Sequence, residues 1–160
     1  MFPREERNTV MRKRIGDPLT IFMNATPVAK IAKTRLEEIR VSVLRNNKVD
    51  VRTYFHYPQE PEPKPTKKGL MLSFKYIPQI LAAFGKLLKD EKYEFNLLLN
   101  ETEKEQLKTY TGDYKGARLV HIRSFYRKEG VFQPGKGIAF PRGLLVPVID
   151  ALKRAEELKD

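Results

Sequence analysis

Two five-residue stretches of this sequence are alike: Val51-Arg52-Thr53-Tyr54-Phe55 and Ile122-Arg123-Ser124-Phe125-Tyr126. Each is followed by a segment with prolines or glycines, then by a Lys-Gly pair and an apolar run. The pairs are Lys68-Gly69 and Lys136-Gly137, and a proline follows each of them at Pro78 and Pro147. The offsets between these matches are 71, 68 and 69 residues. A nearly constant offset indicates an internal repeat of about 70 residues.

Alternation of apolar and polar residues predicts β-strands around both stretches. The predicted strands are Ile39–Leu44 and Val49–Phe55 in the first half, and Leu107–Thr111 and Ala117–Tyr126 in the second. Asn46-Asn47 suits a tight hairpin, since asparagine tolerates a positive φ. In the last strand, Leu119, His121, Arg123 and Phe125 fall on one side, and Arg118, Val120, Ile122, Ser124 and Tyr126 on the other.

Helical spacing of apolar residues predicts one helix near the end of each half. The first is marked by Ile77, Ile80, Leu81, Phe84, Leu87 and Leu88, and the second by Leu145, Val148, Ile149, Leu152 and Ala155. Pro78 and Pro147 fit the first turn of these helices, and Ser73 is a candidate cap for the first. Pro58–Pro65 predicts an extended loop, and Gly130, Pro134 and Gly135 predict a second loop.

Each repeat is too short to form a substantial core by itself. We therefore expect the two helices to cover each other or the opposite sheet, as a pseudo-two-fold pair within one chain.

The composition excludes several classes of protein. The chain has 160 residues, of which 41% are hydrophobic, so a packed interior is expected. It has no cysteine, which excludes disulfides, thiolate zinc sites and cysteine nucleophiles. No apolar run approaches the roughly 20 residues that span a bilayer, and the N-terminal residues do not read as a signal or transit peptide.

The formal net charge is +11, and it is unevenly distributed. Residues 1–80 carry +8, residues 90–105 are acidic, and residues 106–154 carry +7. A basic excess of this size favours a polyanionic partner. The predicted organisation is a basic arm at 1–16, a first repeat at 17–89, an acidic connector and start of the second repeat at 90–105, and a second repeat at 106–160. The arm, with its cluster Arg12-Lys13-Arg14, either supplements nucleic-acid binding or is a disordered tail.

Arg52-Thr53-Tyr54-Phe55, the proline-rich loop, the segment 64–70 and the helix after it resemble the transcriptional coactivator positive cofactor four family. The second half is similar to the same family through residues 113–116, 120–126 and 134–138. The resemblance implies a curved four-stranded antiparallel sheet followed by a helix. Together with the repeat, this predicts an α+β fold: two tandem antiparallel-sheet-plus-helix (ββββα) repeats packed as an intramolecular pseudo-dimer. It also implies binding of single-stranded or unwound DNA.

The resemblance and the chemistry of single-strand recognition select one set of candidate residues. Aromatic rings stack on bases of any sequence, while arginine and lysine hold phosphates. The candidates are Arg52, Tyr54, Phe55, Lys64, Lys67, Lys68, Tyr114, Lys115, Arg118, Arg123, Phe125, Tyr126 and Lys136. The lysines at 64, 67, 68 and 136 are expected in loops.

Strand alternation and the resemblance disagree about two of these aromatic residues. Alternation places Phe55 on the core side and Tyr54 outside, whereas the resemblance places Phe55 outside, which requires a bulge or a strand end there. Tyr126 and Phe125 have the same ambiguity. The first half has Arg45-Asn46-Asn47 where the second has Tyr114-Lys115-Gly116, and Gln133 stands where Lys64 does. Binding is therefore expected to be unequal between the halves.

No catalytic set stands out. Gly130–Lys136 fits seven positions of a phosphate-binding P-loop, but Gly137 stands where Ser or Thr would hold Mg²⁺, and an expected strand follows. His56 and His121 lack metal-ligand spacing. Glu101, Glu103 and Glu105 fit a solvated acidic connector better than a metal site. We expect no enzyme, no cofactor and no metal.

The leading hypothesis is a single-stranded-DNA-binding protein acting in transcription, replication or repair. An RNA-binding protein that uses the same surface, or a protein-interaction adaptor, stays an alternative, since stacking and phosphate contacts do not select the sugar. Expected partners are single-stranded DNA or RNA and transcription or replication proteins, with no membrane; further homodimerisation is left open. The expected location is intracellular: cytoplasmic or nucleoid-associated, or nuclear in a eukaryote.

Overall fold

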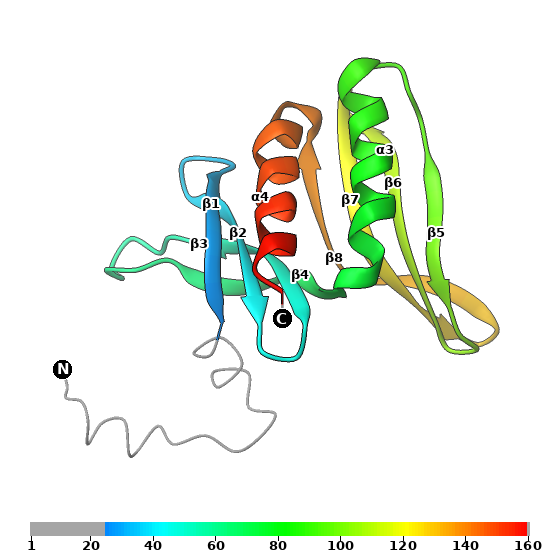
Figure 1. The fold of residues 1–160 in the computed structure, drawn as a ribbon, viewed down its shortest axis with the longest axis horizontal. Helices are drawn as coiled ribbons and strands as arrows, with labels where there is room; N and C mark the ends of the chain where they lie inside the picture. The colour runs from blue at the N-terminus through cyan, green and yellow to red at the C-terminus, as the bar shows by residue number, and fades with distance from the viewer. Residues whose placement is uncertain (1–24, 160) are drawn as a thin grey trace.

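The computed structural model describes residues 25–159, which form two four-stranded antiparallel sheets, each followed by a helix (Figure 1). The predicted arm at 1–16 lies outside the described residues. The first half consists of β1 Thr26–Ala32, β2 Glu37–Leu44, β3 Lys48–Phe55, β4 Lys64–Ser73, the 3-10 turn η1 Phe74–Tyr76 and α3 Ile77–Lys89. The second half consists of β5 Asn96–Glu101, β6 Glu105–Tyr114, β7 Ala117–Lys128, β8 Val131–Pro141, η2 Arg142–Leu144 and α4 Leu145–Glu157. The predicted ββββα repeats are confirmed.

The strand order is the same in both sheets, β1-β2-β3-β4 and β5-β6-β7-β8. The irregularities of the ladders also repeat. The β3–β4 register shifts between Arg52 and Tyr54, and the β7–β8 register shifts at the matching place, between Arg123 and Phe125. Because bulges bend a sheet and increase its twist locally, each sheet is bent beside the arginine that the two repeats share, Arg52 or Arg123.

Turn chemistry explains the hairpins. Lys115 and Gly116 both have positive φ, as do Glu129 and Gly130, and each pair forms a two-residue loop of the kind that matches strand twist. In the first half a three-residue loop ends at Asn47, whose φ is 61°. The predicted hairpin at Asn46-Asn47 is thereby confirmed.

Each helix packs against the sheet of the other half. α4, from the second half, packs on β1 and β2 of the first sheet and also on α3. α3 reaches the second sheet through Phe84, whose ring lies 6.0 Å from that of Phe140 in β8 and 6.4 Å from that of Phe95. Figure 1 shows the two helices side by side on the same side of the molecule. One continuous core results, with buried side chains from both halves. The helices were expected to cover each other or the opposite sheet, and the structure shows both arrangements.

The sequence-based assignment was wrong in four respects. Pro134 and Gly135 lie in strand β8, not in a loop, and Lys64 and Pro65 begin strand β4. Lys67, Lys68 and Lys136 are likewise in strands. Pro65 and Pro134 are tolerated because each flanks a bulge, where a missing ladder hydrogen bond costs least. Ser73 caps η1, by accepting a hydrogen bond from the Lys75 backbone N–H, and not α3 itself.

Gly69 and Gly137 are the glycines that the fold needs for close approach. They lie opposite Arg52 and Arg123 across the ladder. A Cβ at Gly137 would come within 2.7 Å of the Arg123 Cβ and of the Ile122 carbonyl oxygen, and one at Gly69 within 2.6 Å of the Arg52 Cα. These neighbours are mostly backbone or Cβ atoms, so they cannot rotate away.

Replacing Gly137 with alanine is therefore expected to lower the free energy of unfolding by about 1–3 kcal/mol, because the strands must separate locally. Urea denaturation measures this. Gly85→Ala is the matched control: Gly85 is in helix α3 and no atom lies within 4 Å of its added Cβ, so about 0.5–1 kcal/mol of stabilisation is expected. Equal stability of Gly137→Ala and the wild type would contradict the close approach of β7 and β8.

Candidate nucleic-acid interface

Each sheet has a face that points away from the buried core, and we call these the first and second outer faces. The cross-strand register defines them. The first outer face carries Glu38, Arg40, Ser42, Asp50, Arg52 and Tyr54 on β2 and β3. The second carries Gln106, Lys108, Tyr110, His121, Arg123 and Phe125 on β6 and β7. The inner faces carry the buried Val41, Val51, Thr109 and Ile122.

Three rings stand next to one another on the second outer face. Tyr110 and His121 are directly opposite across β6 and β7, and their rings are stacked at 4.5 Å with an angle of 6°. The Phe125 ring lies 6.1 Å from that of Tyr110. These contacts between neighbouring strands hold the rings in fixed positions, as cross-strand aromatic pairs do.

Two cations accompany the rings. Lys108 lies with its Nζ 5.3 Å from the centre of the Phe125 ring, and Arg123 donates a hydrogen bond to the Gly135 carbonyl at 3.0 Å. Within residues 25–159, neither Lys108 nor Arg123 forms an ion pair with a carboxylate. Their charges are therefore available to an anionic ligand.

The surroundings of His121 favour its neutral form. Partial burial lowers its pKa below the ordinary value, and the nearby Arg123 charge lowers that pKa further. Its Nδ1 is buried without a hydrogen-bond partner among the described residues. A neutral imidazole stacks on Tyr110 without placing a third charge beside Arg123, so the second outer face combines two cations with an uncharged stack.

The first outer face is organised by ion pairs. Arg52 bonds to both oxygens of Asp50, at 3.0 and 3.2 Å, and donates to the Thr66 carbonyl at 2.8 Å. The side chains of Arg52 and Asp50 are only 11% and 3% exposed. Burial raises the pKa of Asp50, an effect that the hydrogen bonds from Arg52 oppose. Arg40 is paired with Glu38 and lies over the Tyr54 ring at 4.3 Å.

The structure separates the candidate residues into several groups. Arg123 and Phe125 share the second outer face, and Arg52 and Tyr54 share the first. Phe55 and Tyr126 alternate onto the opposite side and lie near the ends of their ladders; Phe55 is half-buried against Tyr57, and Tyr126 is 46% exposed. Tyr114 and Lys115 form the exposed β6–β7 hairpin tip. Lys64, Lys67, Lys68 and Lys136 are exposed along β4 and β8.

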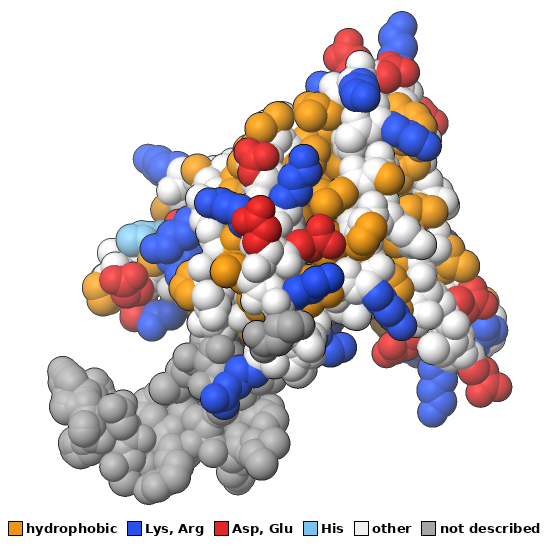
Figure 2. All heavy atoms as spheres, viewed as in Figure 1, with side chains coloured by type: hydrophobic (Ala, Val, Ile, Leu, Met, Phe, Trp, Pro, Cys, Tyr) orange, Lys and Arg blue, Asp and Glu red, His pale blue; other side chains and the backbone are white. Residues whose placement is uncertain are grey.

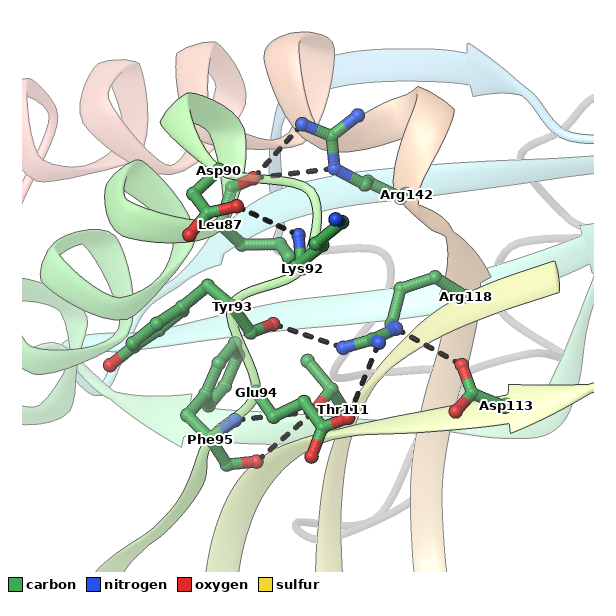
Figure 3. A network of polar contacts seen from close by, with 10 residues as sticks. All are labelled: Leu87, Asp90, Lys92, Tyr93, Glu94, Phe95, Thr111, Asp113, Arg118 and Arg142. Carbon is green, nitrogen blue, oxygen red and sulfur yellow. Dashed lines mark hydrogen bonds and ion pairs between the residues drawn. The ribbon is translucent and has the colours of Figure 1, made fainter.

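Arg118 belongs to a network that fixes the connector between the halves (Figure 3). It donates to the Tyr93 carbonyl at 2.9 Å and pairs with Asp113 at 3.0 Å and Glu94 at 3.5 Å. The same figure shows Arg142 donating to the Leu87 carbonyl at the C-terminal end of α3, where a cation complements the helix dipole. Both arginines thus tie separate segments together.

A groove of about 770 Å³ runs between the halves. Its first-half lining includes Arg45, Lys48, Arg52, Met71 and Lys75, and its second-half lining includes Glu105, Leu107, Ser124 and Lys136. Five of these side chains are basic and one is acidic. The groove is continuous with the first outer face, because Arg52 contributes to both.

Lys108, Tyr110 and His121 were missed as site residues in the sequence analysis. Alternation along the predicted strand Leu107–Thr111 places Lys108 and Tyr110 on one side, and His121 was already expected on the side of Arg123 and Phe125. What was lacking is the register between β6 and β7, which brings Tyr110 opposite His121.

The class of fold is thus two antiparallel ββββα units, the second of which carries three rings and two cations on its outer sheet face. Residues 101–151 match the family model of Transcriptional Coactivator p15 (PC4). The match covers about a third of the chain and lies in the second half, over β6, β7, β8 and part of α4. No curated protein matches the chain. Neither described helix is long and apolar enough to cross a membrane.

Proposed function

We propose that this chain is a non-enzymatic protein that binds single-stranded DNA and acts in transcription, replication or repair. The proposal rests on the second outer face, where three adjacent rings lie beside two cations that form no ion pair with a carboxylate among residues 25–159. Single strands are bound by this combination, since rings stack on bases and cations follow the phosphates. The PC4 match to the same half supports it. We also propose that the first half is a second copy of the same family unit.

On the helix side of the molecule, the described residues carry mixed charge (Figure 2). Figure 2, which views that side, shows acidic and basic side chains interspersed with hydrophobic atoms. Exposed lysines on the helices, such as Lys89 and Lys153, therefore provide control positions remote from the outer faces.

The test is fluorescence anisotropy with a labelled oligo-dT strand and the matching duplex at two salt concentrations. Wild-type protein is expected to prefer the single strand and to lose affinity with salt. In the double variant Lys108→Ala/Arg123→Ala, loss of two phosphate contacts should weaken binding and reduce the log–log salt slope by about 1.4. The control Lys89→Ala/Lys153→Ala removes the same charge and should bind like wild type.

Equal binding by the two double variants would show that the second outer face is not the site. A competition titration with matched RNA decides between DNA and RNA as the preferred strand, because neither stacking nor phosphate contacts read the 2′-hydroxyl. Absence of any oligonucleotide binding would instead favour the protein-interaction adaptor.

A further inference from the structure

The two outer faces occupy matching positions in the repeats but carry different chemistry. In each half a cation on one strand faces an arginine and then a glycine across the ladder: Arg40, Arg52 and Gly69, or Lys108, Arg123 and Gly137. The next row differs. The first half has Ser42 opposite Asp50, and the second has Tyr110 opposite His121. A hydroxyl and a carboxylate thus stand where the second half has two stacked rings.

The second outer face has room for a base to continue its stack. His121 is flanked by Tyr110 on β6 and by Ala139 on β8. Because Ala139 has only a methyl group, no long side chain of β8 lies beside the far side of the imidazole. Phe125 lies on the same face of β7, and the centre of its ring is 6.1 Å from the centre of the Tyr110 ring.

The first outer face lacks such a platform. Its ring is Tyr54, and one side of that ring is covered by the Arg40 guanidinium at 4.3 Å, which Glu38 holds in place. Asp50 and Glu38 would also repel phosphates that approached this face. A base stacking there would have to displace Arg40 from both Tyr54 and Glu38.

Exposed basic side chains are nevertheless more numerous along β4 of the first sheet than along β8 of the second. Lys64, Lys67 and Lys68 are exposed along β4, where the matching part of β8 has Gln133 and Lys136. Burial lowers the pKa of Lys33; the charge of Glu37 opposes this shift, and the charge of Lys68 adds to it. The groove between the halves adds Arg45, Lys48 and Lys75. These side chains suit phosphates and offer no ring.

We propose that the two halves bind different parts of one strand: bases stack on the second outer face, and the first half binds phosphates only. The groove between the halves connects the two surfaces, because its lining includes Arg52 of the first outer face and Gln106 of the second. The inference rests on the proposed function. It assigns one base-stacking surface to each chain, although the fold contains two matching sheets.

The experiment compares oligo-dT with an abasic strand of equal length, which keeps the phosphates and lacks the bases. The ratio of the two affinities measures stacking. Tyr110→Leu/Phe125→Leu is expected to lower oligo-dT affinity by thirtyfold or more, at about 1–3 kcal/mol per stacked base, and to abolish the preference over the abasic strand. Its salt slope should stay that of wild type. Tyr110→Phe keeps the ring and should keep the preference.

Matched first-half variants give the opposite result. Tyr54→Leu should leave both affinities within about twofold of wild type, since its ring contacts no base. Lys67→Ala/Lys68→Ala should reduce the salt slope by about 1.4 and keep the preference for oligo-dT. If Tyr54→Leu loses the preference as fully as the second-half variant, both faces stack bases and the inference is wrong. If wild-type protein binds neither strand, the proposed function itself fails.

Discussion

Replacing Phe84 with alanine is expected to lower the free energy of unfolding by about 3–5 kcal/mol, as is usual for a buried phenylalanine. Phe84 is fully buried in α3, and its ring contacts Phe95 and Phe140 of the other half. The substitution removes a side chain that joins the first helix to the second sheet. The cavity falls between the two repeats, where neither helix is free to close it without leaving its own position.

Urea denaturation followed by circular dichroism measures this loss, and Leu88→Ala is the control. Leu88 is on the same helix but 42% exposed, so its truncation should cost much less. Because the halves share one core, both proteins should unfold in a single transition. Two separate transitions in Phe84→Ala, one of them with wild-type stability, would show that the halves fold independently.

Removing the Asp50 carboxylate is expected to destabilise the protein by about 3–5 kcal/mol in the variant Asp50→Ala, because it removes the carboxylate that compensates the charge of a largely buried arginine. Arg52 bonds to both carboxylate oxygens of Asp50, and its side chain is only 11% exposed. Denaturation in urea at neutral pH measures the change. A variant as stable as wild type would mean that solvent or other groups fully replace the carboxylate.

The paired replacement Asp50→Leu/Arg52→Met removes both charges. Compared with Asp50→Ala, it separates the cost of an uncompensated charge from the contribution of the ion pair to the free energy of unfolding. Burial raises the pKa of Asp50, so ionisation of this carboxylate is itself opposed by its surroundings. Buried ion pairs in such positions are often replaced by apolar side chains with little loss. The double variant is therefore expected to recover most of the stability that Asp50→Ala loses. A double variant no more stable than Asp50→Ala would contradict this reasoning.

Local patterns were sufficient for the parts of the fold with strong periodicity. The hairpins and both helices follow from alternation, from apolar spacing and from Pro78 and Pro147. Strands β1 and β5 were not assigned individually. They are short edge strands, and β5 reads Asn-Leu-Leu-Leu-Asn-Glu, which does not alternate. The start of β8 was mistaken for a loop because Pro134 and Gly135 are loop formers unless a bulge accommodates them.

The candidate site was predictable only in part, because contacts between strands depend on their register. Arg123 and Phe125 were selected from their own strand, and the structure places both on the second outer face. Lys108 and Tyr110 are on a different strand, and their contact with β7 depends on which residues stand opposite one another. A shift of one residue in that register would move Tyr110 to the other face of the sheet.

By itself the sequence determined the repeat, the two helices and the basic character of the chain, because each depends on residue spacing or composition within a short segment. Only the tertiary structure decided that each helix packs against the other half. It also decided that the arginines on one sheet form ion pairs with carboxylates, and that Tyr110 stacks on His121 on the other sheet. Those outcomes depend on packing and register between segments distant in the chain. Side chains that read as equivalent in the two repeats therefore have different partners once the chain is folded.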